Sequence, residues 1–385
     1  MNTGALTILY LVTEDWYFYS HRLGLARAAQ AAGHRVVVGT RCNRQRAALE
    51  REGFTVVDLP FERSLRTPWR DLRAWWLIRR LLGALQPDIV HLVALKPTLL
   101  GGLALRSRRM VPTLCAVAGL GYIFSSSDRL ARLLRAPIVA AFRFIAGHPQ
   151  VHVLTQNDTD RDFLLTAAIA PPARCHVIHG SGIDLAAYPP APLPPPSAPL
   201  VLLPARLLVD KGIYEFVAAA RVLRARWPTL RCVLAGAHDR DNHAAVSAAE
   251  LERWLAEGVI EWHGHASDMV PLYHAASVVC LPSYREGLPR ALLEAAACAR
   301  PLVATDVPGC REICRHEHTG LLVPPRTVAP LAAAIATLLH DRARAERYAQ
   351  AAHAVVAAEF ALAPIAAATL ALYDVMHAQA AAHAE

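Results

Sequence analysis

The sequence has only two lysines, Lys96 and Lys211, although lysine and arginine together number 40. It has no run of about 18 uncharged apolar residues, so we expect no membrane-spanning helix. The apolar run at 6–12 is too short for the core of a signal peptide, and no basic residue precedes it. No G-x-G-x-x-G motif follows this run, which argues against hydride chemistry on a dinucleotide. The composition is that of a globular protein, with 54% apolar and 19% charged residues.

Cysteine is scattered through the chain, and no C-x-x-C pair occurs. Cys310 and Cys314 are four residues apart and could share one helix face, but no second pair of ligands accompanies them. We therefore expect no metal site, and free thiols in the reducing cytosol.

Short apolar segments alternate with stretches of helical spacing along both halves of the chain. Strands are predicted at 6–12, 35–40, 54–60, 88–93, 112–119, 151–156, 175–180, 200–206, 230–236, 259–264, 278–283 and 301–306, followed by helices to the end. The first helix is predicted at 21–34, and residues 13–20 are predicted to form a loop. Buried strands separated by helices indicate α/β domains, each with a parallel sheet covered by helices on both faces.

A proline-rich segment divides the chain, because residues 188–199 contain seven prolines and can form neither a helix nor a central strand. The length of 385 residues favours two domains. We predict an N-terminal Rossmann-like domain at 1–185, a linker at 186–199 and a C-terminal Rossmann-like domain at 200–365. Residues 366–385 are predicted as a C-terminal helix or tail that packs back on the N-terminal domain. Open parallel sheets bind ligands at the carboxyl ends of their strands, so two facing sheets would form a cleft.

Arg206 and Lys211 follow a predicted strand in the segment 203–212. A guanidinium that pairs bidentately, an ammonium and the free N–H groups of a helix N-terminus would together suit a diphosphate. The alternative is a solvated loop with ordinary charges, in which Asp210 caps the helix and needs no ligand.

Two glutamates, Glu286 and Glu294, flank a predicted helix start at Pro289. Gly287 frees the backbone before the helix, so Glu294 would lie roughly 7–8 Å along the axis from the loop that carries Glu286. That offset is compatible with the acid/base pair of a hydrolase, whose carboxyls lie about 5–9.5 Å apart. A hydrolase has no need of a nearby diphosphate clamp, whereas a nucleotide-sugar has hydroxyls at both ends of its diphosphate. We therefore favour two separate hydroxyl-binding carboxylates, although Glu286 could also be a simple turn residue and Glu294 a charge on the helix surface.

The segment EGLPRALLE at 286–294 resembles the E-x7-E motif of the retaining glycosyltransferases of family 4, which have the GT-B fold. ARLLVDKG resembles the Arg-x4-Lys diphosphate clamp of that family. Further similarity extends over almost the whole chain, in HRLGLARAAQAAGHRVVV, DIVHLVALKPTLLGGLA, VAGLGYIF, LTQNDTDRDFL, HGSGIDL and PGCREICRHEHTGLLVPP. ALKP, GLGYIF and TQNDTDRDF are most similar to the branch that builds bacterial polyprenyl-diphosphate-linked glycans, which includes N-acetylgalactosaminyl and other hexosaminyl transferases.

The resemblance implies a role for each matching charged residue. Arg206 and Lys211 would bind the donor diphosphate and offset charge on the departing nucleotide, so neither a metal nor another cofactor is implied. Glu286 would contact the hydroxyls of the donor sugar, and Glu294 would hold those of the ribose. The reaction would retain configuration by front-face attack, with the leaving phosphate helping to take the acceptor proton.

Uncharged parts of the same motifs would complete the donor site. The backbone of Gly287 and Leu288 would support the sugar or the phosphate. The loop of His263, Gly264 and His265 would read the base, which the resemblance favours as uracil over guanine.

The acceptor side departs from the family pattern at residues 95–97. Many members have a His-x-Pro segment near the reacting sugar, whereas this chain has Leu-Lys-Pro. Lys96 would contact the acceptor diphosphate, or it is a lysine at a strand end without a ligand. His91 would also lie on the acceptor side, but the alternative, a strand histidine that is partly buried, is favoured.

Four further residues are assigned to the acceptor side. Gly121 and Tyr122 would shape it. His21 is predicted to open the first helix, where the helix N-terminus would lower its pKa. Asp15, in the predicted first loop, would orient the acceptor hydroxyl.

The positive charge belongs to the first half of the chain. Residues 1–190 carry 23 Lys and Arg against 13 Asp and Glu, a balance of +10, and residues 191–385 carry 17 against 19, a balance of −2. Residues 63–82 interleave arginine with three tryptophans, and 106–109 and 128–145 are also basic and apolar. Such segments suit an anionic membrane surface, and the alternative is a pair of amphipathic helices whose tryptophans face the core. No RNA-binding motif is present, so nucleic acid is not an expected partner.

The resemblance implies a glycosyltransferase that moves a sugar from a UDP-sugar to a polyprenyl-diphosphate-linked saccharide, with an N-acetylhexosamine as the favoured sugar. It would work in the cytoplasm at the inner face of the cytoplasmic membrane. The alternatives are a UDP-hexose or GDP-mannose donor with another acceptor, a nucleotide-sugar epimerase or hydrolase, and a non-catalytic membrane-associated binding module.

Overall fold

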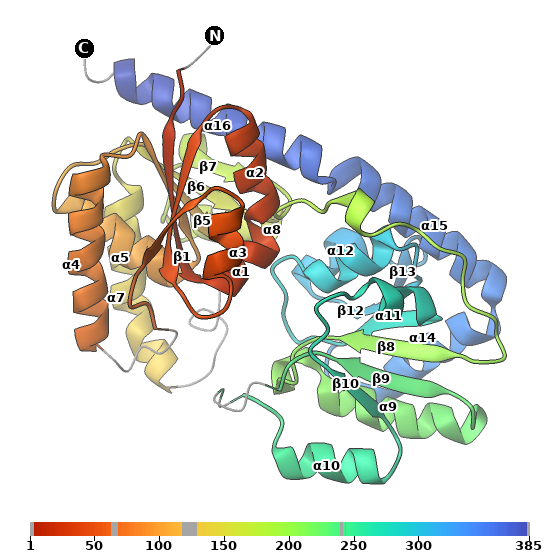
Figure 1. Cartoon of the computed structure of the whole chain (residues 1–385). Coiled ribbons are helices and arrows are strands. Elements are labelled where there is room, and N and C mark those ends of the chain that lie inside the picture. The colour runs from red at the N-terminus through yellow and green to blue at the C-terminus, as the bar shows by residue number, and fades with distance from the viewer. Residues whose placement is uncertain (1–3, 63–67, 118–128, 239–241, 243, 383–385) are drawn as a thin grey trace. The chain divides into compact units, whose positions relative to one another are not determined.

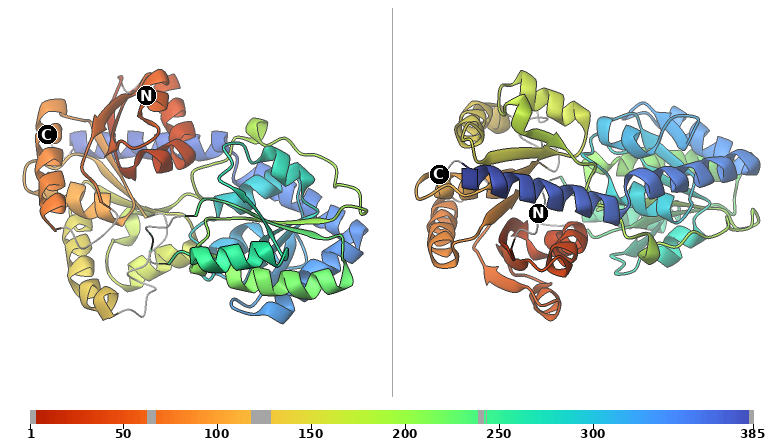
Figure 2. Two further views of the ribbon diagram at one scale, coloured as in Figure 1. Left: turned by 60° about the horizontal axis from the view of Figure 1, so that its bottom comes forward. Right: turned by 90° about the horizontal axis from the view of Figure 1, so that it is seen from above.

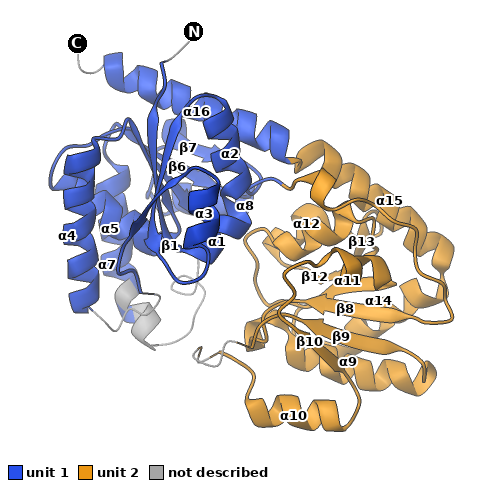
Figure 3. Ribbon diagram, in the orientation of Figure 1, with its two compact units in different colours: residues 1–182, 362–385 blue, residues 183–361 orange. Residues whose placement is uncertain are grey.

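The computed structural model describes residues 4–62, 68–117, 129–238, 242 and 244–382. The chain forms two compact units: unit 1 comprises residues 1–182 and 362–385, and unit 2 comprises residues 183–361 (Figure 3). The chain passes from unit 1 to unit 2 after Gly182 and returns after Ala361.

Unit 1 is built on a parallel sheet with seven strands in its described residues, in the order β3-β2-β1-β4-β5-β6-β7 (Figure 1). The strands are β1 (Thr7–Glu14), β2 (Arg35–Arg41), β3 (Thr55–Asp58), β4 (Ile89–Val93), β5 (Thr113–Val117), β6 (Val151–Thr155) and β7 (Cys175–Val177). Strands β4, β5 and β6 are buried at every position, as expected when helices cover both faces of a parallel sheet.

Alternate residues of β1 lie in two different cores of unit 1. Ile8 and Tyr10 pack under the helices α1 (Asp15–His21), α2 (Leu23–Ala31), α3 (Arg46–Arg51) and α16 (Leu362–Ala382). Leu9 and Leu11 pack under the helices α4 (Pro68–Leu85), α5 (Leu95–Arg106), α7 (Arg129–Ala146) and α8 (Asp158–Thr166). A short 3-10 helix, η1 (Pro172–Arg174), precedes β7.

Unit 2 repeats this plan with six parallel strands in its described residues, in the order β10-β9-β8-β11-β12-β13. The strands are β8 (Leu200–Pro204), β9 (Arg231–Ala235), β10 (Glu261–Gly264), β11 (Val278–Leu281), β12 (Leu302–Thr305) and β13 (Gly320–Val323). The helices are η2 (Leu185–Ala187), η3 (Val209–Lys211), α9 (Ile213–Arg226), α10 (Ala248–Ala256), α11 (Val270–Ala275), α12 (Arg290–Ala297), α13 (Pro308–Ile313), α14 (Val328–His340) and α15 (Arg342–Glu359). Two cores lie on opposite faces of the sheet, one under α9, α10 and α14 and the other under α11, α12 and α13.

Two secondary-structure predictions were wrong. Residues 13–20, predicted as a loop, continue β1 and then form α1, because Phe18 is fully buried and its ring packs edge-on against Tyr10 at 5.4 Å. The strand β13 lies in a region predicted to be helical, since Gly320 and the three apolar residues after it pair with β12. Both are short segments whose conformation depends on tertiary neighbours.

The proline-rich segment 186–199, predicted as a linker, falls within unit 2. The fully buried Arg300 donates hydrogen bonds to the carbonyls of Ala191 and Pro192, and Arg342 donates to the carbonyl of Pro194 at 2.7 Å. Prolines cannot donate backbone hydrogen bonds, but their carbonyls accept them, so two arginines fix this segment to its unit.

Helix α16 belongs to unit 1 (Figure 3). Its Tyr373 is fully buried, and its hydroxyl lies 3.0 Å from the hydroxyl of Tyr10 and 2.5 Å from Nδ1 of His91. His91 also stacks on Tyr10, with ring centroids 4.9 Å apart. The C-terminal helix is therefore attached to the central strands β1 and β4 by a buried polar contact.

Candidate active site

The loops that follow β8, β9 and β10 lie together at the carboxyl edge of the sheet of unit 2. Gly236, directly after β9, donates its N–H to the carbonyl of Gly264 at 2.8 Å. A Cβ at Gly236 would lie 2.0 Å from the carbonyl oxygen of Ala205, so only glycine fits there. This close packing brings the loop of Arg206 beside the end of β10, where His263 lies in the strand and only His265 lies in the loop after it, both exposed.

Lys211 and Glu286 meet in unit 2 although they are far apart in the sequence. Nζ of Lys211 lies 2.6 Å from Oε1 of Glu286, and the two side chains are only 19% and 11% exposed. Lys211 ends the 3-10 helix η3, and α9 starts only at Ile213. The N-cap of α9 is Gly212 and not Asp210, so the predicted capping role of Asp210 was wrong.

Gly212 determines where Lys211 lies. Its φ of 71° is in the left-handed region, and a Cβ there would come within 2.1 Å of the carbonyl oxygen of Pro282. The loop after β8 is further joined to the loop after β11, because Tyr284 donates its N–H to the carbonyl of Asp210 at 2.8 Å. The ammonium and the carboxylate are thus placed by two loops in direct backbone contact.

Glu294 has a different set of partners from Glu286. It is the fifth residue of α12 and is 9% exposed. Its Oε1 accepts hydrogen bonds from the hydroxyl of Tyr188 at 2.8 Å and from Nε of Arg290 at 2.8 Å, and its Oε2 accepts one from the hydroxyl of Tyr273 at 2.9 Å. Burial, and then the charge of Glu294, raise the pKa of Tyr273 well above its usual range, so this phenol remains a donor.

The two glutamates therefore lie in different environments, which argues against an acid/base pair. Glu286 balances a lysine at the loop, and Glu294 pairs with Arg290 within α12. A carboxylate oxygen can accept about two hydrogen bonds, so Oε2 of Glu294 retains capacity for a ligand hydroxyl. The backbone around Gly287 is confined as well, because a Cβ on Gly309 would lie 2.3 Å from the carbonyl oxygen of Gly287. Leu288 packs against the adjacent apolar core.

Of the residues predicted for the acceptor side, the structure describes Asp15, His21, His91 and Lys96. Asp15 is fully buried and its Oδ2 accepts the backbone N–H groups of Asn43, Arg44 and Gln45 at 2.7–2.8 Å. Asp15 therefore holds the loop after β2, and its predicted role toward an acceptor hydroxyl stays a prediction.

The two predicted acceptor histidines also differ from expectation. His21 is the last residue of α1 and does not open a helix, so its predicted pKa effect from a helix N-terminus was wrong. Its ring stacks on Tyr17 with centroids 4.2 Å apart. His91 is a histidine of strand β4, as favoured, but it is fully buried and not partly so. Burial followed by the charge of Arg22 lowers its pKa well below the usual histidine range. Gly121 and Tyr122 lie outside the described residues.

Lys96 lies at a cavity of about 220 Å³ in unit 1. This cavity is at the carboxyl ends of β1 and β4 and is lined by Val12, Thr13, Glu14, Trp16, Tyr17, Glu62, Val93, Ala94 and Lys96. The ammonium of Lys96 lies 2.6 Å from Oδ1 of Asp71 and donates to the carbonyl of Glu62 at 2.8 Å. Lys96 therefore has partners within unit 1, and its predicted contact with an acceptor diphosphate stays a prediction.

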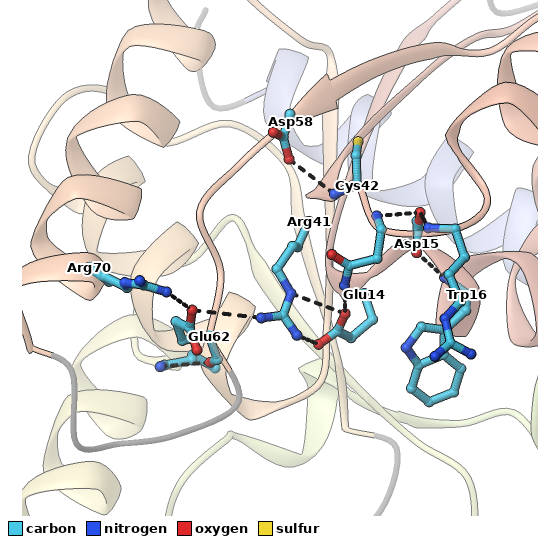
Figure 4. Close-up of polar contacts among 11 residues, drawn as sticks. Glu14, Asp15, Trp16, Arg41, Cys42, Asp58, Glu62 and Arg70 are labelled. Carbon is cyan, nitrogen blue, oxygen red and sulfur yellow. Dashed lines mark hydrogen bonds and ion pairs between the residues drawn. The ribbon is translucent and has the colours of Figure 1, made fainter. Parts of the chain in front are cut away.

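A chain of ion pairs continues from this cavity (Figure 4). The guanidinium of Arg41 pairs with both oxygens of the buried Glu14 and lies 3.7 Å from Glu62, which also pairs with Arg70. The backbone of Ala94, with φ 73° and ψ 169°, adopts a conformation that residues other than glycine rarely adopt, and such strain is concentrated at functional sites. A sugar could stack on Trp16 or Tyr17 here and donate hydroxyls to the carboxylates.

Sequence reasoning missed Glu14, Trp16, Tyr17 and Glu62 in unit 1. The first three could have been found from their place after a buried strand, because ligands bind at the carboxyl ends of parallel strands. It also missed Tyr188 and Tyr273, for which no signal in the sequence indicates a contact with Glu294.

No group of three or more His, Cys, Asp or Glu residues in the described part of the chain could hold a metal ion. None of the helices in the described residues is both long and apolar enough to span a membrane.

Comparison with known families identifies both halves of the chain. A model described as Glycosyltransferase Family 4 matches residues 20–187, and one described as Glycosyl transferases group 1 matches residues 198–341. The chain belongs to the family 4 glycosyltransferases. Its resemblance to this family is thereby confirmed, and so is its identity as a glycosyltransferase.

Relatives agree with this assignment. The N,N'-diacetylbacillosaminyl-diphospho-undecaprenol alpha-1,3-N-acetylgalactosaminyltransferase of Campylobacter jejuni is 28% identical over 75% of this chain and 77% of its own length. The glycogen synthase of Mycobacterium tuberculosis is 34% identical, over 50% of this chain and 47% of its own length. These two glycosyltransferases have different substrates by name, so the family does not by itself define a substrate.

Solved structures confirm the predicted GT-B fold of two Rossmann-like domains. The sucrose-phosphate synthase of Thermosynechococcus elongatus matches with a TM-score of 0.80 at 21% identity, over 97% of this chain and all of that one. Anabaena Alr3699/HepE, solved in complex with UDP and glucose, matches with a TM-score of 0.78 at 19% identity, over 96% of this chain and all of that one.

Proposed function

We propose that this glycosyltransferase transfers an N-acetylhexosamine from a UDP-sugar to a polyprenyl-diphosphate-linked saccharide, with retention of configuration and without a metal. The observation that carries the proposal is the contact of Lys211 with Glu286 beside the loop of Arg206. This contact joins an ammonium and a carboxylate at the carboxyl edge of unit 2, which supports a site for a diphosphate and sugar hydroxyls.

The chemistry of the donor site follows from these groups. When a diphosphate enters, the ammonium of Lys211 and the guanidinium of Arg206 offset its charge as the sugar leaves. Glu286 then accepts hydrogen bonds from sugar hydroxyls, and Glu294 accepts them from the ribose through the remaining capacity of Oε2. Two fixed cations supply the charge that a divalent metal would otherwise supply, so we expect transfer to continue in a chelator.

The acceptor is proposed to bind at the cavity of unit 1 that Glu14, Trp16, Tyr17 and Lys96 line. Aromatic rings present an apolar face to a sugar ring, and the neighbouring charged groups fix the orientation of its hydroxyls. The choice of a lipid-linked acceptor is supported by the similarity to the Campylobacter enzyme, which acts on a diphospho-undecaprenol substrate by name. Such an acceptor would place the enzyme at the cytoplasmic face of the membrane, in the assembly of a surface polysaccharide such as capsule or O-antigen.

A donor screen tests the proposal. UDP- and GDP-sugars are compared first by thermal shift and then by transfer to a polyprenyl-diphosphate-linked saccharide, with and without EDTA. We expect a UDP-N-acetylhexosamine to give the largest shift and the only efficient transfer, and NMR of the product to show the anomeric configuration of the donor. A larger shift with GDP-mannose would overturn the donor assignment. Label released to water or left on the nucleotide, never on acceptor, would instead support a hydrolase or epimerase.

A further inference from the structure

Helix α4 presents an apolar stripe to solvent. Trp69 is 77% exposed, Leu72 is 66% exposed and Trp76 is 49% exposed. Their spacing of three and four residues places them on one face of the helix. A shallow, open surface depression lies along this face and is lined by Pro68, Trp69, Leu72, Arg73, Trp75 and Trp76.

The fold of unit 1 does not require this stripe. The opposite face of α4 contributes Ala74, Ile78 and Leu82, which are buried in the core against the sheet. Both views of Figure 2 show α4, in orange, at the outer edge of unit 1. Exposing two tryptophans and a leucine together is unfavourable in water, so this face is suited to a partner that removes it from water.

The charge around the stripe restricts the partner. Residues 68–146 carry 12 Lys and Arg against three Asp and Glu, a balance of +9, so the rest of the chain carries 28 against 29. The net positive charge of the protein therefore belongs to the segment 68–146, which contains α4, α5 and α7. The guanidinium of Arg80 lies over the ring of Trp76 at 4.7 Å, and that of Arg106 lies over Phe144 at 4.2 Å. Apolar anchors mixed with arginine match an anionic lipid surface, with tryptophan at the interface and arginine at headgroup phosphates.

Two other partners fit this surface less well. A second copy of the chain would bring two strongly basic layers together, which is electrostatically unfavourable. A single-stranded nucleic acid needs open aromatic faces for stacking, but the guanidinium of Arg80 already covers a face of Trp76.

We infer that the Trp69–Leu72–Trp76 face of α4 docks on an anionic phospholipid surface. The first turns of α4 lie next to the acceptor cavity, because Arg70 pairs with Glu62 and Asp71 pairs with Lys96, and both partners line that cavity. Docking through this end of α4 therefore brings the cavity close to the headgroup layer. The inference that docking delivers a lipid-linked acceptor to this cavity rests on the proposed function, whereas the lipid docking itself does not.

Vesicle sedimentation tests the docking. The wild-type chain is mixed with vesicles of phosphatidylcholine alone or with about one third phosphatidylglycerol, at low and high salt. We expect binding only to the anionic vesicles, weakened by salt, and at least tenfold weaker for the double variant Trp69→Glu and Trp76→Glu. The matched control is Val222→Glu on α9 of unit 2, which replaces a side chain that is 58% exposed and should bind like the wild type.

Several results would overturn the inference. The first two are equal vesicle binding by the double variant and the wild type, and no binding of the wild type to anionic vesicles. The third is concentration-dependent self-association of the wild type that the double variant loses, which would indicate a second copy as the partner. The fourth is RNA binding by the wild type that the double variant loses, which would indicate a nucleic acid. Circular dichroism and thermal unfolding of each variant confirm that it folds.

A second measurement separates this inference from the proposed function. The double variant and the wild type are compared on a long-chain acceptor in anionic vesicles and on a short-chain, water-soluble diphosphate acceptor. We expect the variant to lose at least tenfold in rate on the vesicle acceptor and to stay within about twofold of wild type on the soluble one, because the stripe lies outside the reacting groups. If the variant and the wild type had equal rates on each of the two acceptors, the docking role would be overturned. Absence of transfer by the wild type to either acceptor would overturn the proposed function and leave the sedimentation result to decide the docking.

Discussion

The ammonium of Lys211 lies 2.6 Å from the carboxylate of Glu286, across 75 residues of sequence. The two residues come from the loops after neighbouring strands, β8 and β11, at the carboxyl edge of unit 2. Their contact joins the two motifs through which the sequence resembles its family, so both contribute to one site.

Lys211→Ala and Glu286→Gln should each reduce kcat/KM for the donor on the order of 10²-fold or more, because each removes a group aimed at charge or hydroxyls of the donor. Because the two groups act together, the double variant should lose less than the product of the single losses. Steady-state kinetics with UDP-sugar and acceptor measures this. The control is Arg221→Ala, which breaks an exposed ion pair with Glu257 in the same unit and should leave kinetics within about twofold. Near-wild-type transfer in both single variants would contradict the site assignment.

Glu294→Gln should weaken UDP binding by about tenfold, or 1.4 kcal/mol, because a neutral amide is a poorer acceptor for ribose hydroxyls and interacts less favourably with Arg290. Isothermal titration calorimetry measures the affinity. Tyr188→Phe is the matched variant, since it keeps the charge of Glu294 but removes one donor to Oε1. It should change UDP affinity less than Glu294→Gln does. The reverse order would show that Tyr188, and not Glu294, holds the nucleotide.

Gly212→Ala should destabilise unit 2 by about 1–3 kcal/mol and reduce transfer, because the new Cβ would meet the carbonyl of Pro282 and the left-handed backbone would be strained. Urea unfolding and donor kinetics measure the two effects. Gly258→Ala is the control: its φ of 64° is similar, but nothing lies within 4 Å of the added Cβ. The difference between the two variants isolates the steric contact that positions Lys211. Equal stability and equal activity of the two variants would contradict this account.

Unit 1 should lose stability as the pH falls from about 6.5 toward 4. Burial, then the charges of His176 and Arg174, lower the pKa of His152 to about 4, and burial lowers the pKa of His91 and of His176. In this window the unfolded chain binds protons that the folded chain excludes, so the free energy of unfolding decreases with falling pH. Urea unfolding at pH 8, 6.5 and 5 measures the slope.

His152→Gln should flatten that slope, because it removes one group that the unfolded state protonates and the folded state does not. The ring of His152 stacks on His176, so some stability is also lost at pH 8, where protonation plays no part. An unchanged slope in the His152 variant would show that other groups cause the acid sensitivity.

Much of the fold was predictable because its strands are continuous apolar runs. Strands β4, β5 and β11, for example, lie within predicted segments, since they are buried on both faces and need no partner to be recognised. The helix α1 and the strand β13 were missed, because each is short and is stabilised by a tertiary contact, of Phe18 with Tyr10 and of Gly320 with β12. Short elements of this kind have weak local preferences.

The sequence by itself determined the family, the alternation of strands and helices, the motif positions of Arg206, Lys211, Glu286 and Glu294, and the location of the positive charge in the first half. Each of these can be read from neighbouring residues or from spacing along the chain. Only the tertiary structure decided which side chains meet and which face of a helix stays in water. It buried Asp15 and His91, surrounded Glu294 with two tyrosines, and left Trp69 and Trp76 exposed. These outcomes depend on packing between segments that are distant in the chain. An amphipathic or aromatic pattern indicates an apolar helix face, but it does not specify whether another segment covers that face.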